Sequence, residues 1–108
     1  MSRTMVLADD VLRRIRRDPR FRAAAEGRVS STDWRSRGAC LRFDPELFFP
    51  NAADDPAPAM AVCSNCPVQA SCLAAALDAG ECDGVWGGTT PYERRVMRRV
   101  WPSMVGSR

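Results

Sequence analysis

The chain has 108 residues, a formal net charge of +3 and no histidine. This length allows one small domain, and such a domain often needs a metal or another covalent staple beside its modest core. The lack of histidine excludes Cys/His zinc fingers and histidine-based acid–base catalysis. The apolar stretch near the N-terminus is too short for a signal peptide, and no window approaches the length of a membrane span. We therefore expect a cytoplasmic protein with no membrane partner.

Charge is distributed unevenly along the chain. Residues 1–40 carry a net charge of +5, residues 41–90 carry −6, and residues 91–108 carry +4. All sixteen basic residues are arginine, which suits phosphate and carboxylate recognition, although a GC-rich genome also enriches arginine codons. The two basic ends are the candidates for contact with an anionic partner.

The first expected helix covers residues 5–17, where Leu7, Val11, Leu12 and Ile15 recur at the helical period. Asp18-Pro19 ends it, because a residue before proline avoids the helical conformation. A second short helix is expected from Phe21 to Glu26, and a polar linker follows. We divide the chain into an N-terminal extension (1–33), a functional domain (34–101) and a short tail (102–108). The extension could dock on the domain, bind a partner or touch an anionic surface.

Three further helices are expected in the functional domain. After the loop PNAADDPAP, a short helix runs from Met60 to Cys66, and the clearest helix runs from Val68 to Ala79 with Gly80 as its C-terminal cap. The last helix starts with Thr90 as N-cap and Glu93 completing a capping box, and we expect Pro102 to end it. Because no segment alternates like a strand, the expected fold is all-α, a small bundle of short helices.

The last helix has two different faces. Val96 and Val100 share one face with Tyr92 and Met97. The other side carries four arginines, and a charge run of this kind is usually a solvated helix face. Their density exceeds what solubility requires, so phosphate contact is the sharper interpretation. The candidate DNA-binding residues are Arg94, Arg95, Arg98 and Arg99.

Four cysteines have the spacing Cys40-x22-Cys63-x2-Cys66-x5-Cys72. Four soft thiolates suit either Zn²⁺ or an iron–sulfur cluster, and the spacing alone does not distinguish them. A closed four-cysteine zinc site is the leading alternative. A thioredoxin-like CxxC is less favoured because no strand–helix–strand unit surrounds it, and a reducing cytoplasm disfavours disulfides.

The fifth cysteine, Cys82, lies between Glu81 and Asp83. Adjacent negative charge makes a thiol less reactive, so an incidental thiol is the simpler interpretation. The alternative is a reserve ligand, or a disulfide partner after the loss of a metal group.

Several motifs follow one another in a specific order. They are Trp34-x5-Cys40, the segment DPELFFP at 44–50, VCSNCPV at 62–68 with Cys72-Leu73, GVWGG at 84–88, and Glu93-Arg94-Arg95. In this order they resemble the WhiB-like family of actinobacterial and actinophage transcription regulators. The resemblance covers roughly residues 34–100.

The resemblance implies a small all-helical protein that binds a [4Fe–4S] cluster through Cys40, Cys63, Cys66 and Cys72. It implies binding to region 4 of the principal sigma factor within RNA polymerase, and a cluster that reacts with nitric oxide and, more variably, oxygen. The family turn corresponds to Gly84, Val85, Gly87 and Gly88 around Trp86, and the basic segment after it corresponds to a DNA contact.

Four aromatic residues stand near these motifs. Each of them singly is best interpreted as core packing. Because interfaces favour aromatic anchors, we also expect a shared role in shielding the cluster and contacting the sigma factor. These residues are Trp34, Phe48, Phe49 and Trp86.

The function expected from the sequence is thus a redox- and nitric-oxide-responsive transcription regulator, not an enzyme, with no small-molecule substrate. Two alternatives stay open. One is a thiol–disulfide reductase that uses Cys63 and Cys66 in the apo form, and the other is a structural zinc adaptor.

Overall fold

A computed structural model of the whole chain describes residues 9–27, 33–51, 53–80 and 83–105. These residues contain no β-strand, only an isolated bridge between Trp86 and Thr89, so the all-α prediction is confirmed. The elements in chain order are α1 (Asp9–Arg17), α2 (Pro19–Glu26), the short 3₁₀ helices η1 (Asp33–Arg37), η2 (Ala39–Arg42) and η3 (Pro45–Phe48), then α3 (Ala57–Ser64), α4 (Gln69–Ala79) and α5 (Pro91–Val105).

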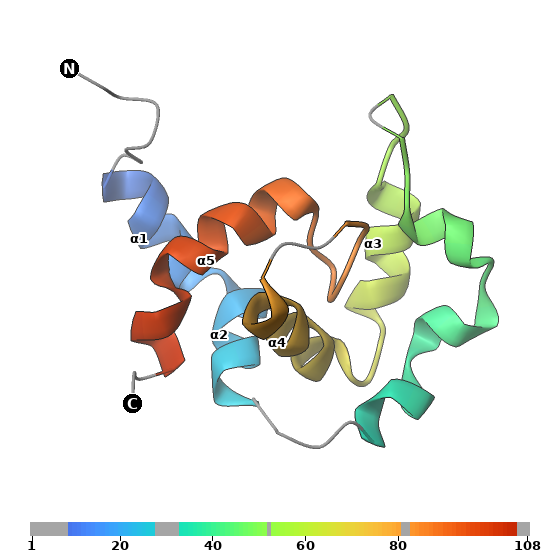
Figure 1. Cartoon of the computed structure of the whole chain (residues 1–108), viewed down its shortest axis with the longest axis horizontal. Coiled ribbons are helices and arrows are strands. Elements are labelled where there is room, and N and C mark those ends of the chain that lie inside the picture. Colours follow the sequence, from blue (N-terminus) through green and yellow to red (C-terminus); the bar gives the residue numbers. More distant parts are fainter. Residues whose placement is uncertain (1–8, 28–32, 52, 81–82, 106–108) are drawn as a thin grey trace.

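The main core forms where α1 and α2 pack against α4 and α5 (Figure 1). Phe21 of α2 is fully buried, and its ring lies 5.7 Å from the ring of Trp101 in α5. The described part of the N-terminal extension therefore docks on the domain, as one of the three interpretations of the sequence predicts. The buried residues of this core are Phe21, Ala24, Leu73, Ala74, Leu77, Met97, Val100 and Trp101.

A second, smaller apolar cluster lies on the other side of the molecule. It joins η3, α3 and the segment after α4 through Phe48, Ala59, Cys63 and Val85. The three 3₁₀ helices form an arc outside α3 (Figure 1). This cluster includes Cys63, one of the four cysteines of the motif.

Local signals set most helix ends. Asp18 caps α2 by accepting a hydrogen bond from the Arg20 amide, and Gly80 caps α4. The capping box of α5 is complete, since the Thr90 amide donates to Glu93 Oε1 at 3.0 Å and the Glu93 amide donates to Thr90 Oγ1 at 3.2 Å. The end of α4 and the start of α5 agree with the sequence predictions, whereas α2 begins at Pro19, two residues before the predicted Phe21, because Asp18 caps it.

The expectation that Pro102 ends the last helix is wrong. Helix α5 continues to Val105 with Pro102 inside it. A proline in a helix costs a hydrogen bond and some steric strain. Here Trp101, Met104 and Val105 pack on the main core, and Trp101 Nε1 donates to Asp78 Oδ1 at 2.9 Å. This tertiary packing offsets the cost of the proline.

Two other details differ from the sequence prediction. Helix α3 begins and ends earlier than the predicted span of Met60 to Cys66, because Pro58 falls in its first turn, where proline is tolerated. The 3₁₀ helices η1 to η3 were not predicted, since short polar and proline-containing segments carry no helical repeat.

No single described helix is long and apolar enough to cross a membrane. Helices α3 and α4 together pass a test of length and composition, but they are bent by 119° relative to each other. The apolar residues of α4 are accounted for by its place in the main core.

Candidate cysteine site

Three chain segments supply the four cysteines. Cys40 lies in η2, Cys63 in the last turn of α3, Cys66 in the connection to α4, and Cys72 in the first turns of α4. The amide of Ala39 donates to Cys66 Sγ at 3.3 Å, which joins η2 to the α3–α4 connection. The fold thus closes the long loop between the first cysteine and the other three.

The four thiols influence one another electrostatically. Burial raises the pKa of Cys72 to about 12, the amide of Gly87 opposes this rise, and the charges of the other three cysteines add to it. Burial likewise raises the pKa of Cys63, with contributions from Cys66 and Cys40. Like charges affect each other this way only when they are close, so the fold gathers the predicted set into one group.

A tight glycine turn faces this group. Trp86 and Thr89 exchange backbone hydrogen bonds of 3.1 and 2.9 Å, and Gly87 and Gly88 between them have φ of 57° and 76°. Two central residues with positive φ define the primed turn of a two-residue hairpin, which favours glycine. The Gly88 amide acts to lower the pKa of Cys63 and the Gly87 amide acts to lower that of Cys72, so both amides lie near these sulfurs.

The turn is held against the cysteine segments by direct contacts. A side chain at Gly87 would place its Cβ 2.6 Å from Leu73 Cβ, so only glycine allows this approach to α4. Gln69 Nε2 donates to the Gly87 carbonyl oxygen at 3.0 Å. On the other flank, the Val85 amide donates to the Phe48 carbonyl oxygen at 2.7 Å, and Gly84 lies against Phe49. The turn is therefore packed between α4 on one flank and the Phe48-Phe49 segment on the other.

The donor chemistry fits an iron–sulfur cluster. Such clusters are held by cysteine thiolates, and hydrogen bonds to the sulfurs tune them. Four gathered thiols and the two amides of Gly87 and Gly88 meet both requirements. Among the described residues, no three His, Cys, Asp or Glu side chains are placed to hold a single metal ion.

The predicted aromatic residues divide into buried and exposed members. Trp34 and Phe48 are buried, Trp86 is half-buried with Nε1 donating to the Asp83 carbonyl oxygen, and Phe49 is 55% exposed. Sequence reasoning missed two exposed apolar residues near Cys40, namely Leu41 and Phe43, which are 66% and 46% exposed. The sequence did carry a signal for them. Both are apolar residues next to Cys40, in a segment that lacks a helical repeat and therefore has no apolar face to bury them.

The expectation that Arg94 belongs to the exposed arginine face is wrong. Arg94 is fully buried, and its guanidinium donates to the carbonyl oxygens of Thr89 and Gly84 at 2.8 and 2.7 Å. It braces the glycine turn from within. Its neighbour Tyr92, expected on the apolar face, is instead 64% exposed.

The other three arginines of α5 differ in exposure. Arg95 and Arg99 are exposed, and Arg98 is half-buried with Nη1 donating to the Gly80 carbonyl oxygen at 3.2 Å. Arg95 and Arg99 are four residues apart and share one face of the helix. These two are the exposed arginines of the predicted set.

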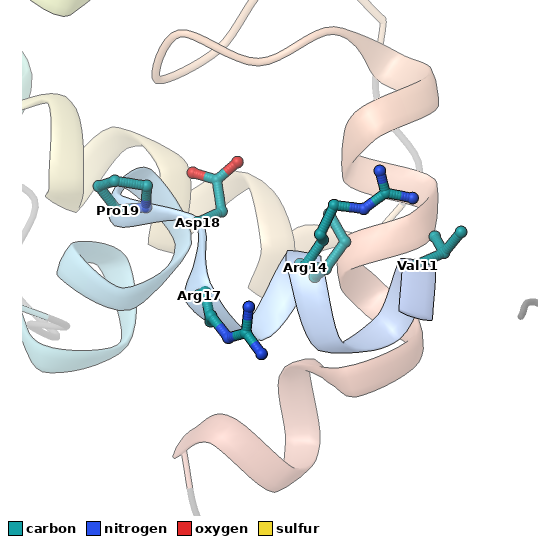
Figure 2. Close-up of a pocket in the computed structure, with 6 residues that line it drawn as sticks. Val11, Arg14, Arg17, Asp18 and Pro19 are labelled. Atoms are coloured by element: carbon teal, nitrogen blue, oxygen red, sulfur yellow. The ribbon is translucent and has the colours of Figure 1, made fainter. Parts of the chain in front are cut away.

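A shallow hollow lies apart from the cysteines, at the corner between α1 and α2 (Figure 2). The labelled Asp18 carboxylate is already engaged by Arg20, at 2.7 Å. No cysteine lines this hollow, so we do not assign it to the site. Its lining residues are Val11, Arg14, Ile15, Arg17, Asp18 and Pro19. Cys82 lies outside the described residues.

The structure thus defines a small all-helical protein that brings four cysteines together beside a glycine turn. Residues 34–97 match the family model "Transcription factor WhiB", so the chain belongs to the WhiB family of transcriptional regulators. Helices α1 and α2 lie outside the matched residues.

Relatives with assigned names agree with the family. The chain is 46% identical over 72 residues to "Transcriptional regulator WhiB1" of Mycobacterium tuberculosis (strain ATCC 25618 / H37Rv), which covers 62% of this chain and 86% of that protein. It is 45% identical over 75 residues to "Transcriptional regulator WhiB1" of Bifidobacterium longum (strain NCC 2705), and the matched part is 65% of this chain and 82% of that protein. It is 37% identical over 70 residues to "Transcriptional regulator WhiB2" of Mycobacterium tuberculosis (strain ATCC 25618 / H37Rv), and the matched part is 65% of this chain and 79% of that protein.

Proposed function

We propose that this transcriptional regulator binds a [4Fe–4S] cluster through Cys40, Cys63, Cys66 and Cys72 and acts in the cytoplasm as a redox- and nitric-oxide-responsive switch. The observation that carries the proposal is the contact that closes the long loop of the four-cysteine motif, where the Ala39 amide beside Cys40 donates to Cys66 Sγ at 3.3 Å. Four thiolates with amide donors suit an iron–sulfur cluster. The cluster would supply a group that reacts with nitric oxide and oxygen.

The chain's own residues set how such a group would be held. Because thiols bind iron as thiolates and burial raises the pKa of Cys72, loading of the site would depend on pH. Because the four cysteines come together only in the folded chain, cluster binding and folding would be coupled. Because Cys40 is distant in sequence from the other three, loading of the site would lock η2 onto the α3–α4 connection. Loss of the group would release η2 together with the aromatic residues that follow it.

We propose region 4 of the principal sigma factor as the protein partner. The surface that supports this lies on η2 and η3, where Leu41, Phe43 and Phe49 are exposed beside the cysteine site. Interface cores are enriched in aromatic residues, and a cluster of exposed apolar side chains on a small domain marks an interaction site. Buried Trp34 and Phe48 would support this surface from below.

We propose that DNA phosphates contact the basic side of α5. Arg95, Arg99 and Ser103 follow one another at four-residue spacing on one face of the helix. Arg16 of α1 donates from Nη1 to Ser103 Oγ at 3.1 Å, so α1 extends the same row with a further arginine. A row of arginines on two helices offers several phosphate contacts without base-specific readout.

The thiol–disulfide reductase alternative has less support. A reductase thiol needs a lowered pKa, whereas burial raises the pKa of Cys63. The zinc adaptor remains the competing metal assignment for four thiolates.

One experiment tests the main proposal. The chain is coexpressed anaerobically with region 4 of the host's principal sigma factor, and the copurified material is assayed for iron, sulfide and zinc. We expect a brown complex with four irons and four sulfides per chain, which bleaches with nitric oxide. A colourless protein with one zinc per chain would establish the adaptor instead.

A further inference from the structure

Arg20 connects the N-terminal helices to the glycine turn. It lies at the start of α2, outside the residues that match the family. Its Nη2 lies 2.7 Å from Asp18 Oδ2 and 3.1 Å from Glu93 Oε2. Its Nη1 donates to the carbonyl oxygen of Gly88 at 2.5 Å. One side chain therefore joins α2, the turn and the capping box of α5.

The environment of Arg20 keeps this clamp charged. Hydrogen bonds with Asp18 raise the pKa of the guanidinium. Partial burial opposes this rise, and Glu93 adds to it. Asp18 also accepts from the Arg20 amide at 2.9 Å, so the same carboxylate caps α2 and orients the side chain. Phe21, the next residue, is fully buried in the main core and anchors the backbone of Arg20.

The two peptide groups that flank Gly88 are each held by a different side chain. Gln69 donates to the carbonyl oxygen of Gly87. That carbonyl and the Gly88 amide form one peptide group, and this amide lies near Cys63. Arg20 donates to the carbonyl oxygen of Gly88, which forms the next peptide group with the Thr89 amide. The Thr89 amide donates to the Trp86 carbonyl oxygen at 2.9 Å. Gln69 and Arg20 thus fix consecutive peptide planes of the turn.

This clamping matters because glycine peptides rotate easily. Both Gly87 and Gly88 lack a side chain that would restrict φ and ψ, so external contacts must hold their amides toward sulfur. Hydrogen bonds to cluster sulfurs raise the reduction potential and depend on orientation. A residue that holds the turn therefore acts on the cysteine site without touching it.

We propose that Arg20 is a positioning residue for the cysteine site: by holding the Gly88 carbonyl, it keeps the Gly87 and Gly88 amides directed at Cys72 and Cys63. The N-terminal helices are then a support that tunes the site from outside the family domain. This inference rests on the proposed cluster, because its clearest readouts are the potential and lifetime of that cluster.

The test compares three variants with the wild-type chain, each purified anaerobically. Arg20→Met removes the clamp, Arg20→Lys keeps the charge but not the multiple hydrogen bonds, and Arg22→Met alters an exposed arginine of the same helix. The measurements are midpoint potential, the rate of cluster loss in air, and hydrogen exchange of the peptide spanning 84–90.

For Arg20→Met we expect a more negative potential, faster amide exchange in the turn and cluster loss about fivefold faster, as befits one weakened hydrogen bond. Arg20→Lys should be intermediate, and Arg22→Met should match the wild type. If Arg20→Met does not fold by circular dichroism, Arg20→Lys alone decides.

The outcomes separate the inference from the function on which it rests. A wild-type chain without iron and sulfide overturns the proposed function, and the inference with it. A loaded wild type whose Arg20 variants keep its potential and turn exchange overturns the inference alone. Lower stability at an unchanged potential also overturns it, because a merely structural role predicts that result.

Discussion

The buried guanidinium of Arg94 donates from Nη2 to the carbonyl oxygen of Gly84 at 2.7 Å. It also binds the Thr89 carbonyl, so one side chain joins both ends of the glycine turn. Together with Arg20, which holds Gly88 from outside, it makes the turn a braced structure. Two arginines thus position the backbone amides beside the cysteines.

Replacement of Arg94 tests this brace. Arg94→Met should lower the free energy of unfolding by about 3 kcal/mol, because it leaves the carbonyls of Gly84 and Thr89 buried without their charged donor. Arg95→Met, at an exposed neighbour, should change it by less than about 0.5 kcal/mol. Urea denaturation under anaerobic conditions measures both, and equal effects would contradict the assigned role of Arg94.

A pair of glycine variants tests the close packing of the turn. Gly87→Ala and Gly80→Ala both force a side chain onto a backbone with positive φ, at 57° and 94°. Only at Gly87 does the new Cβ meet another residue, Leu73, at 2.6 Å, whereas nothing lies within 4 Å at Gly80. We expect Gly87→Ala to be about 2 kcal/mol less stable than Gly80→Ala and to retain less iron. Matching thermal unfolding and iron content in the two variants would refute this.

Serine substitutions test the ligand set. Replacing any one of Cys40, Cys63, Cys66 and Cys72 should abolish or strongly reduce iron and sulfide after anaerobic purification, because four thiolates hold the proposed cluster. Cys82→Ser should load as the wild type does. A full complement of iron in one of the four variants, or its loss in Cys82→Ser, would change the assignment.

Adjacent phenylalanines separate partner contact from core packing. Phe49 is 55% exposed and Phe48 is 7% exposed. Phe49→Ala should weaken copurification with sigma region 4 by at least tenfold while unfolding changes little, as for an interface anchor. Phe48→Ala should cost about 3 kcal/mol of stability as a core truncation. Undiminished sigma binding by Phe49→Ala would place the interface elsewhere.

The salt dependence of DNA binding tests the arginine row on α5. The double variant Arg95→Gln and Arg99→Gln should reduce the slope of log K against log salt by about 1.8, as expected for two lost phosphate contacts. Arg37→Gln, an exposed arginine on η1, serves as the control and should leave the slope unchanged. Fluorescence anisotropy with duplex DNA at several salt concentrations measures the slope. An unchanged slope in the double variant would remove these residues from the proposed contact.

Much of the helical organisation was predictable because helix ends depend on neighbours in sequence. The Asp18-Pro19 break, the Gly80 cap and the Thr90–Glu93 capping box each involve residues at most four positions apart. The short 3₁₀ helices escaped prediction because they lack a repeat. The spacing of the four cysteines is visible in the sequence motifs, whereas the approach of η2 to the α3–α4 connection depends on the fold.

By itself, the sequence determined the all-α class, the main helix boundaries and the four-cysteine motif, since all three depend on local chemistry and spacing. The tertiary structure decided that α5 continues past Pro102, that Arg94 is buried, and that Arg20 reaches the glycine turn. The last contact joins residues 68 positions apart. Interactions of that range arise only once the helices pack, because no local preference of the chain encodes which distant carbonyl a guanidinium will meet.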